Sequence, residues 1–295
     1  MINLNDAMFT DRSIRILKYA EQEAKKTTKL VYPIHLLLGA LQERTGVCAE
    51  LFITYPKLID ILFDRVYKIQ SASEEQNIHC PPFSMPVSLS VKNVLADAIL
   101  LRERYKQNFI NEGHLIKAIF AQKDPLTTLH VKGLDHSLII KIMSATRDMI
   151  VSLANYSYPR ISETTVKYRK AEKDDAISLK SFVEKEFGSG WIESIENGLQ
   201  AENIPIYVAT ENEKLIGFAC YDVYQRKKGL FGPMGVAMSN RIRGVGYTLL
   251  HCCLKEMQEK NYAYAIISEA GPIEFYEKAC GAIVIPNSEL GEERG

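Results

Sequence analysis

One segment, Gly232–Leu250, constrains the fold of this chain more than any other. Its beginning is typical of a strand, a turn rich in glycine and arginine follows, and an apolar stripe then predicts a helix that packs on a sheet. In the turn, Gly244 and Gly246 let the backbone approach a ligand closely, and the first amides of the helix have no partner within it. Because these amides lie at the positive end of the helix dipole, and Arg241 and Arg243 add charge, the turn is suited to a pyrophosphate.

The chain has two parts that differ in their pattern of apolar residues. Residues 1–150 have apolar residues at three- and four-residue spacing, which predicts helices nearly throughout. Residues 151–165 are polar and contain Pro159, so we expect a linker there. Residues 166–295 alternate short β-rich segments with helical ones. A length of 295 residues with 46% hydrophobic residues is enough for two cores, so we predict an all-α domain followed by an α/β domain.

The first part repeats itself. The pattern of apolar residues that begins at Phe9 recurs 78 residues later, beginning at Val87. The apolar helix that begins at His35 recurs 79 residues later, beginning at His114. We therefore predict two helical units of equal length that pack as a pseudo-twofold pair, joined by the hydrophilic residues 71–86. Each histidine opens an apolar helix, where an imidazole commonly caps or packs, so we expect a structural role rather than a metal or catalytic pair.

At these residues the chain resembles the N-terminal domain of Clp-type AAA+ unfoldases. The similarity is carried by FTDRSIRILKYAEQEAKK (residues 9–26) and HLLLGALQERTGVCAELF (residues 35–52). The resemblance implies a tandem repeat of four-helix units that docks a protein partner, peptide or substrate. In some members acidic residues directly before each histidine receive phosphoarginine; here those positions are Ile34 and Gly113. No G-x-x-x-x-G-K-[ST] loop occurs in the sequence, so an AAA+ ATP-binding motif is absent from it.

The second part resembles the GNAT N-acetyltransferases. Arg241-x-x-Gly244-x-Gly246 is similar to the CoA-binding motif of that family, and GPIEFYEKACGA (residues 271–282) is similar to its helix-borne F-Y-E-K-x-G-F/A signature. Val166–Ala176 resembles the family's opening strand and first helix. The resemblance implies a mixed, mostly antiparallel sheet and acetyl-CoA as co-substrate, with no metal. It assigns acetyl-CoA binding to Val236, Met238, Arg241, Arg243, Gly244, Val245, Gly246 and Tyr247.

By the same resemblance, the strand near Gly235–Met238 diverges from its neighbour and pairs with the pantetheine arm, with the thioester in the gap. Tyr276 is the candidate general acid for the leaving thiolate, and the amide of Val236 is expected to stabilise the oxyanion. Glu269 and Glu274 are candidate general bases, and a water relay is the alternative. Three cysteines on apolar helix faces, Cys252, Cys253 and Cys280, are expected to pack rather than to carry an acyl group.

The balance of charge gives no reason to expect a nucleic-acid or membrane partner, because Lys+Arg and Asp+Glu both count 36. The six cysteines are scattered and form no C-x-x-C pair, and the first residues lack the pattern of a signal peptide. We therefore expect free thiols and a cytoplasmic protein.

These features predict an enzyme that moves an acetyl group from acetyl-CoA to a primary amine of a small molecule or a protein. The sequence after Ile283 is shorter than the β-hairpin with which many GNAT enzymes end. A shortened tail, a second subunit in a homodimer, or the N-terminal domain would then complete the acceptor pocket. The alternatives are a binding protein, an adaptor or decoy of the Clp system, and a sensor of acetyl-CoA without turnover.

Overall fold

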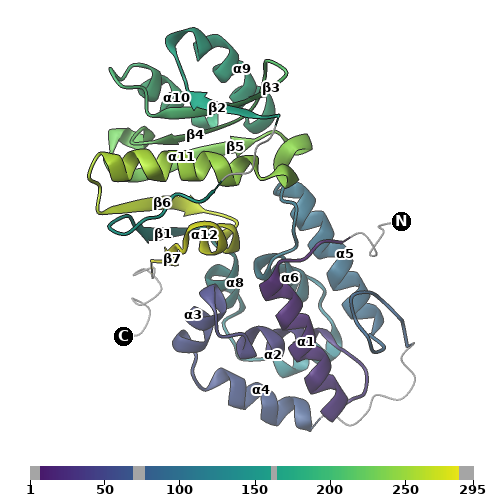
Figure 1. Ribbon diagram of the computed structural model, residues 1–295. Coiled ribbons are helices and arrows are strands. Elements are labelled where there is room, and N and C mark those ends of the chain that lie inside the picture. Colours follow the sequence, from purple (N-terminus) through teal and green to yellow (C-terminus); the bar gives the residue numbers. More distant parts are fainter. Residues whose placement is uncertain (1–6, 69–76, 161–164, 286–295) are drawn as a thin grey trace. The chain divides into compact units, whose positions relative to one another are not determined.

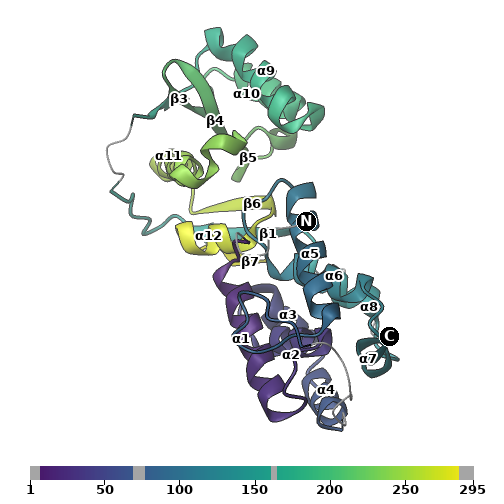
Figure 2. The same ribbon diagram turned by 90° about the vertical axis from the view of Figure 1, so that its right-hand side faces the viewer.

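The computed structural model describes residues 7–68, 77–160 and 165–285, and the chain divides between Thr146 and Arg147 into two compact units (Figures 1 and 2). The first unit is all-α, and the second is built on a mixed sheet. Within the described residues, no helix combines the length and the apolar character that crossing a membrane requires.

The helical unit consists of two four-helix runs whose first two helices match in length. The first run is α1 (Asp11–Lys26), α2 (Pro33–Gln42), α3 (Gly46–Thr54) and α4 (Leu58–Tyr67). The second is α5 (Leu89–Arg104), α6 (Glu112–Ala121), α7 (Pro125–His130) and α8 (His136–Ser144). Because α1 and α5 both have 16 residues, and α2 and α6 both have 10, the predicted repeat is confirmed. The predicted connector 71–86 lies partly outside the described residues.

The two runs exchange backbone hydrogen bonds at equivalent places. The amide of Thr10, the N-cap of α1, donates to the carbonyl of Ile110 at 3.0 Å, and the amide of Ser88, the N-cap of α5, donates to the carbonyl of Val31 at 2.9 Å. Each bond joins the start of one run to the segment before the second helix of the other. This exchange is the pseudo-twofold pairing that the sequence predicts.

The two histidines cap helices. Nδ1 of His35 accepts from the amide of Tyr32 at 2.9 Å, and Nδ1 of His114 accepts from the amide of Asn111 at 3.1 Å. Each imidazole thus satisfies an amide just before its helix, as the structural interpretation predicted. Burial, which disfavours the charged imidazolium, lowers the pKa of both histidines to about 4.

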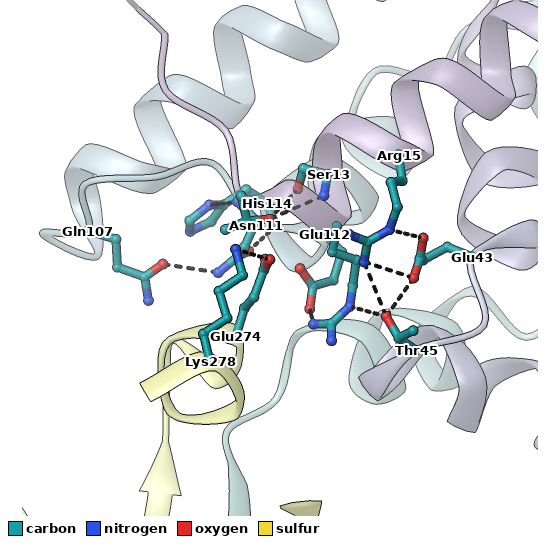
Figure 3. A network of polar contacts seen from close by, with 12 residues as sticks. Ser13, Arg15, Glu43, Thr45, Gln107, Asn111, Glu112, His114, Glu274 and Lys278 are labelled. Atoms are coloured by element: carbon teal, nitrogen blue, oxygen red, sulfur yellow. Dashed lines mark hydrogen bonds and ion pairs between the residues drawn. The ribbon is translucent and has the colours of Figure 1, made fainter. Parts of the chain in front are cut away.

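A polar network links the first run to the second (Figure 3). The guanidinium of Arg12 in α1, only 2% exposed, donates to Glu112 in α6 at 2.8 Å. Arg15 forms two hydrogen bonds with Glu43, and the hydroxyl of Thr45 contacts Glu43 as well as Arg12. The carboxylate of Glu112 is therefore engaged inside the domain.

The second unit is a seven-stranded sheet covered by helices on both faces. The strands are β1 (Arg147–Ser152), β2 (Lys167–Lys170), β3 (Ile206–Glu211), β4 (Lys214–Tyr221), β5 (Leu230–Val236), β6 (Tyr264–Ala270) and β7 (Ile283–Val284). Their spatial order is β2-β3-β4-β5-β6-β1-β7, and every pair is antiparallel except β5 with β6. This is the mixed, mostly antiparallel sheet that was predicted, and β2 is the expected opening strand.

Alternation along β4 divides the core into two layers. Ala219 and Tyr221 point into the layer beneath α11 (Val245–Glu259) and α12 (Ile273–Cys280), whereas Phe218 and Cys220 point into the layer beneath α9 (Ala176–Phe187) and α10 (Ile192–Leu199). The apolar stripe of α11 is buried, as its periodicity predicted.

β1 is the main departure from the predicted organisation. Residues 147–152, which were expected to end the helical domain and begin the linker, form a strand between β6 and β7. The segment carries alternating buried residues, with Met149 0% and Val151 4% exposed, and this period of two is what a half-buried strand requires. The strand follows α8 after only two residues, so the two units are joined without the long linker that we expected.

Residues 153–159, which we call the docked segment, lie against α11 rather than forming a free linker. The side-chain amide of Gln258 donates to the carbonyls of Leu153 and Tyr156 at 2.9 and 3.0 Å. The hydroxyl of Tyr158 lies 3.8 Å from Sγ of Cys252. The segment is therefore anchored to α11 at Cys252 and Gln258.

Candidate functional site

The parallel pair of strands separates where the site begins. β5 and β6 pair only at Leu230 with Ile266 and at Phe231 with Ile267. Phe231 and Met234 of β5 pair with Tyr221 and Ala219 of β4. They are three residues apart in β5 but their partners are only two apart in β4, so β5 carries a bulge there. Bulges bend a strand and increase its twist, which accounts for the separation. The divergence expected from the sequence is thus seen in the register.

A turn at the end of β5 presents the first amides of α11. A 3₁₀ segment, Met238–Arg243, leads to Gly244, which has φ +75° and is the N-cap of the helix. The first helical hydrogen bond runs from the amide of Thr248 to the carbonyl of Gly244 at 3.1 Å. The amides of the intervening residues, Val245, Gly246 and Tyr247, therefore have no acceptor within the helix and face the helix end.

The two glycines of the turn have different physical roles. Gly244 needs its left-handed conformation, and a Cβ there would meet no atom within 4 Å, so the space beside it is open. A Cβ on Gly246 would lie 3.5 Å from Cγ2 of Val236, an ordinary packing distance. Met238 is 49% exposed. The side chains of Arg241 and Arg243 lie outside the described part of the chain, so their predicted contacts stay predictions.

The backbone of β5 directs one amide toward the gap. The amide of Ala237, the residue after β5, donates to the carbonyl of Ile216 in β4 at 2.9 Å. Because successive amides of a strand point to opposite sides, the amide of Val236 points away from β4, toward the side where β6 diverges. This is the direction that an oxyanion donor in the gap requires.

Tyr276 lies next to the point where the strands separate. Its ring packs edge-on against Phe231, the last β5 residue paired with β6, at 6.3 Å, and against Phe275 at 4.9 Å. Burial raises the pKa of the Tyr276 phenol above its usual range, so the group carries its proton at neutral pH.

The two candidate bases differ in their surroundings. Glu269 is exposed and lies in a bulge of β6, with a left-handed φ of +49°. Asp148 stabilises the bulge, because its Oδ1 accepts a hydrogen bond from the Glu269 amide at 2.8 Å. Glu274 is buried on α12 and forms an ion pair with Lys278 at 2.9 Å (Figure 3). Because Lys278 engages the Glu274 carboxylate whereas Glu269 is exposed to solvent, Glu269 is the more accessible candidate of the two.

The cysteines near the site are in the thiol form. Burial raises the pKa of Cys252, of Cys253 and, to about 11, of Cys280. The thiolate is the nucleophilic form of cysteine, so these values favour the packing role that the sequence suggested.

The sequence missed a pocket of about 390 Å³ between α11, the end of α12 and the docked segment. Its walls include Asn155, Tyr156, Tyr247 and His251. Only Tyr247 was among the predicted ligand-binding residues. The pattern of the docked segment gave no signal, because its residues were interpreted as a solvated linker.

Comparison with family models decides what the two units are. Residues 8–131 match the Clp repeat (R) N-terminal domain, and residues 173–282 match the acetyltransferase (GNAT) family. The chain joins a Clp N-terminal domain to a GNAT domain. The GNAT match begins at Lys173, after β1, the docked segment and β2.

Solved structures resemble each domain separately. A GCN5-related glucosamine N-acetyltransferase region of a fungal multi-domain β-N-acetylglucosaminidase is 16% identical, with a TM-score of 0.42, and the match covers 48% of this chain and 20% of that one. The N-terminal domain of ClpD from Arabidopsis thaliana is 23% identical, with a TM-score of 0.38, over 48% of this chain and 94% of that one. An acetyltransferase of the GNAT family from Colwellia psychrerythraea is 17% identical, with a TM-score of 0.37, over 47% and 53%. A search of curated proteins found no match.

Proposed function

We propose that the GNAT domain transfers the acetyl group of acetyl-CoA to a primary amine by direct attack. The observation that carries this proposal is the first turn of α11, whose outward amides and open Gly244 lie at the end of β5, the strand that diverges from β6. An amide-rich helix end suits the pyrophosphate of CoA. The gap between the strands suits the pantetheine arm, whose amides can form hydrogen bonds with the backbone of a strand.

The proposed chemistry has one attack and one collapse. The amine nitrogen attacks the thioester carbonyl carbon, and the amide of Val236 donates to the oxyanion that forms. The carbon–sulfur bond then breaks as the carbonyl re-forms. Tyr276 gives its proton to the departing thiolate, and the amine loses a proton to Glu269 or to a water molecule. The products are free CoA and the N-acetylated acceptor.

The Clp N-terminal domain is proposed to bind the acceptor or a protein partner. The two positions where relatives bind phosphoarginine hold Ile34, which is 0% exposed, and Gly113, where a Cβ would lie 3.0 Å from the carbonyl oxygen of Met143. Neither supplies a carboxylate to the surface. The partner chemistry of this domain is therefore proposed to differ from phosphoarginine recognition.

Thermal unfolding with acetyl-CoA tests the donor site. A ligand that binds only the folded state raises Tm as its concentration exceeds Kd. We expect acetyl-CoA to raise Tm of the parent and not of Gly244→Val, because a β-branched residue does not tolerate φ +75° and fills the open space beside the amides. Gly229→Val is the matched control, since Gly229 also has a left-handed φ of +82° with open space around it but lies at the opposite end of β5.

Acceptor specificity is tested by thiol release. A panel of aminoglycosides, amino sugars, polyamines and lysine peptides is incubated with acetyl-CoA, and free CoA is measured. A Tm shift without acceptor-dependent thiol release on any amine would favour the acetyl-CoA sensor instead. If Gly244→Val keeps the full shift while Gly229→Val also does, the donor site lies elsewhere.

A further inference from the structure

The bulge in β6 changes which residue of that strand faces the core. Ala265 and Ile267 are buried in the layer beneath α11 and α12, and strict alternation would place Glu269 in the same layer. Instead, Ala270 is buried there and Glu269 is exposed. The extra residue of the bulge thus moves a carboxylate out of an apolar core and into contact with solvent.

The same bulge lies where the proposed reaction needs a base. Ile267 is the last β6 residue that pairs with β5, and Glu269 follows two residues later, on the part of β6 that diverges. Tyr276 packs against Phe231, which is the β5 partner of Ile267. The proposed acid and the candidate base therefore both lie next to the point where the strands separate.

One side chain of β1 holds both residues of the bulge. In the register of β1 with β6, Asp148 stands opposite two residues, Ser268 and Glu269. Its Oδ1 accepts from the Glu269 amide at 2.8 Å and from the Ser268 hydroxyl at 3.1 Å. A bulge interrupts the ladder of backbone hydrogen bonds, and here the Asp148 side chain supplies an acceptor at the interruption.

Glu269 depends on this support because of its backbone conformation. Its φ of +49° lies in the left-handed region, which residues other than glycine adopt only where the surrounding structure holds them. Without a bond that fixes its amide, the backbone of Glu269 can relax toward the extended conformation of the strand. The direction of its side chain would then change, since side-chain direction in a strand follows the backbone.

We propose that Asp148 is a positioning residue for acetyl transfer, because its bond to the Glu269 amide holds the Glu269 carboxylate where it takes the proton of the amine. The inference rests on the proposed function and assigns the base to Glu269. As the amine nitrogen bonds to the carbonyl carbon, its N–H bond breaks and the proton passes to Glu269. After the products leave, Glu269 gives this proton to solvent, and Tyr276 regains from solvent the proton that it gave to the thiolate.

A double-mutant cycle tests this role through the group on which Asp148 acts. Thiol release is measured for the parent, Asp148→Ala, Glu269→Gln and the double variant, on an amine that the parent acetylates. We expect Glu269→Gln to lower kcat by about 10²-fold or more, the loss of a general base. Asp148→Ala should lower kcat about tenfold, since misplacing a group by about 1 Å can cost about 10²-fold. In the Glu269→Gln background, Asp148→Ala should cause no further loss, because the positioned carboxylate is already absent.

Two further variants control for the loss of a hydrogen bond as such. Asp148→Asn keeps the accepting oxygen, so it should retain most of the parent's kcat. Asp175→Ala is the matched control, because Asp175 also accepts a backbone amide, that of Glu172, at 2.8 Å, but follows β2 at the opposite edge of the sheet from β7. Its kcat should equal that of the parent. All variants should keep the rise of Tm with acetyl-CoA.

Several results would overturn the positioning role while acetyl transfer stands. They are a parent-like kcat in Asp148→Ala or in Glu269→Gln, an equal loss from Asp148→Ala in both backgrounds, and an equal loss in Asp148→Asn and Asp148→Ala. Tm without ligand shows whether each variant folds. If Asp148→Ala does not fold, Ser268→Ala decides, because it releases one contact of Asp148 and leaves the Glu269 amide in place. A partial loss of kcat that vanishes in the Glu269→Gln background would support the role, and a parent-like kcat would overturn it.

A failure of the proposed function has a different signature. If the parent releases thiol with none of the amines, acetyl transfer is wrong, and the role of Asp148 with it.

Discussion

At the scale of single residues, Tyr276 gives the sharpest test of the chemistry. We expect Tyr276→Phe to lower kcat by about 10²–10⁴-fold, the usual range for loss of a general acid, and to leave the Kd of acetyl-CoA unchanged, because the ring keeps its contacts with Phe231 and Phe275. Single-turnover measurements on a working acceptor isolate the chemical step. Equal rates for the two proteins would transfer the acid role to water.

The raised pKa of Tyr276 also fixes a pH dependence. Its acid form persists above pH 10, the usual pKa of tyrosine, so the parent should show no loss of kcat from phenol ionisation up to about that pH. A parent profile that falls near pH 8 would assign the titrating acid to another group. The family signature in the sequence was enough to select Tyr276. It could not find His251 or Tyr156, because their proximity depends on the path of the docked segment rather than on spacing within a motif.

At the scale of elements, the histidine caps of α2 and α6 make the helical unit sensitive to acid. The pKa of His35 and of His114 falls from 6.5 to about 4 on folding. Between pH 4 and pH 6.5 the unfolded chain therefore binds more protons than the folded chain. The contribution of the neutral histidines to the free energy of unfolding is complete above pH 6.5 and is lost as the pH falls toward 4. The loss is up to about 3 kcal/mol for each histidine.

Two optical probes follow this loss in the full chain. Trp191 is the only tryptophan and lies in the second unit, so its fluorescence reports that unit, while far-ultraviolet circular dichroism also follows the helical unit. Between pH 7 and pH 4.5 we expect the urea midpoint seen by dichroism to fall, and to fall less in His114→Gln. A pH-independent midpoint in the parent would contradict the assignment of the caps.

The elements themselves were largely predictable. Self-similarity along the chain found the helical repeat, the helical period found α11 with its buried stripe, and the resemblance to GNAT enzymes found β2. The bulge in β5 could not be read from sequence, since it depends on how β4 pairs with it. β1 was missed because it has only six residues and directly follows a helix. The alternation of apolar and polar residues along it is too short to be distinguished from the helical pattern before it.

At the scale of the whole molecule, β1 determines where the chain can be cut. A fragment of residues 1–146 should fold as a helical domain and unfold cooperatively. A fragment of residues 147–295 should fold and bind acetyl-CoA, whereas residues 166–295 should not, because removing β1 leaves β7 without its partner and uncovers one edge of β6. Circular dichroism and the acetyl-CoA-dependent Tm of the three fragments test this. Equal stability of the two C-terminal fragments would restore the boundary predicted from sequence.

The place of β1 in the sheet also imposes an order on synthesis. β1 leaves the ribosome before every other strand, yet the two strands that flank it are the last to emerge. The helical domain can therefore finish folding while Met149 and Val151, buried in the mature sheet, still lack their cover. Such long-range pairing is slow to form. A nascent chain interrupted before β6 would thus carry a folded first domain that ends in an unpaired apolar strand, which is the kind of edge that captures other chains.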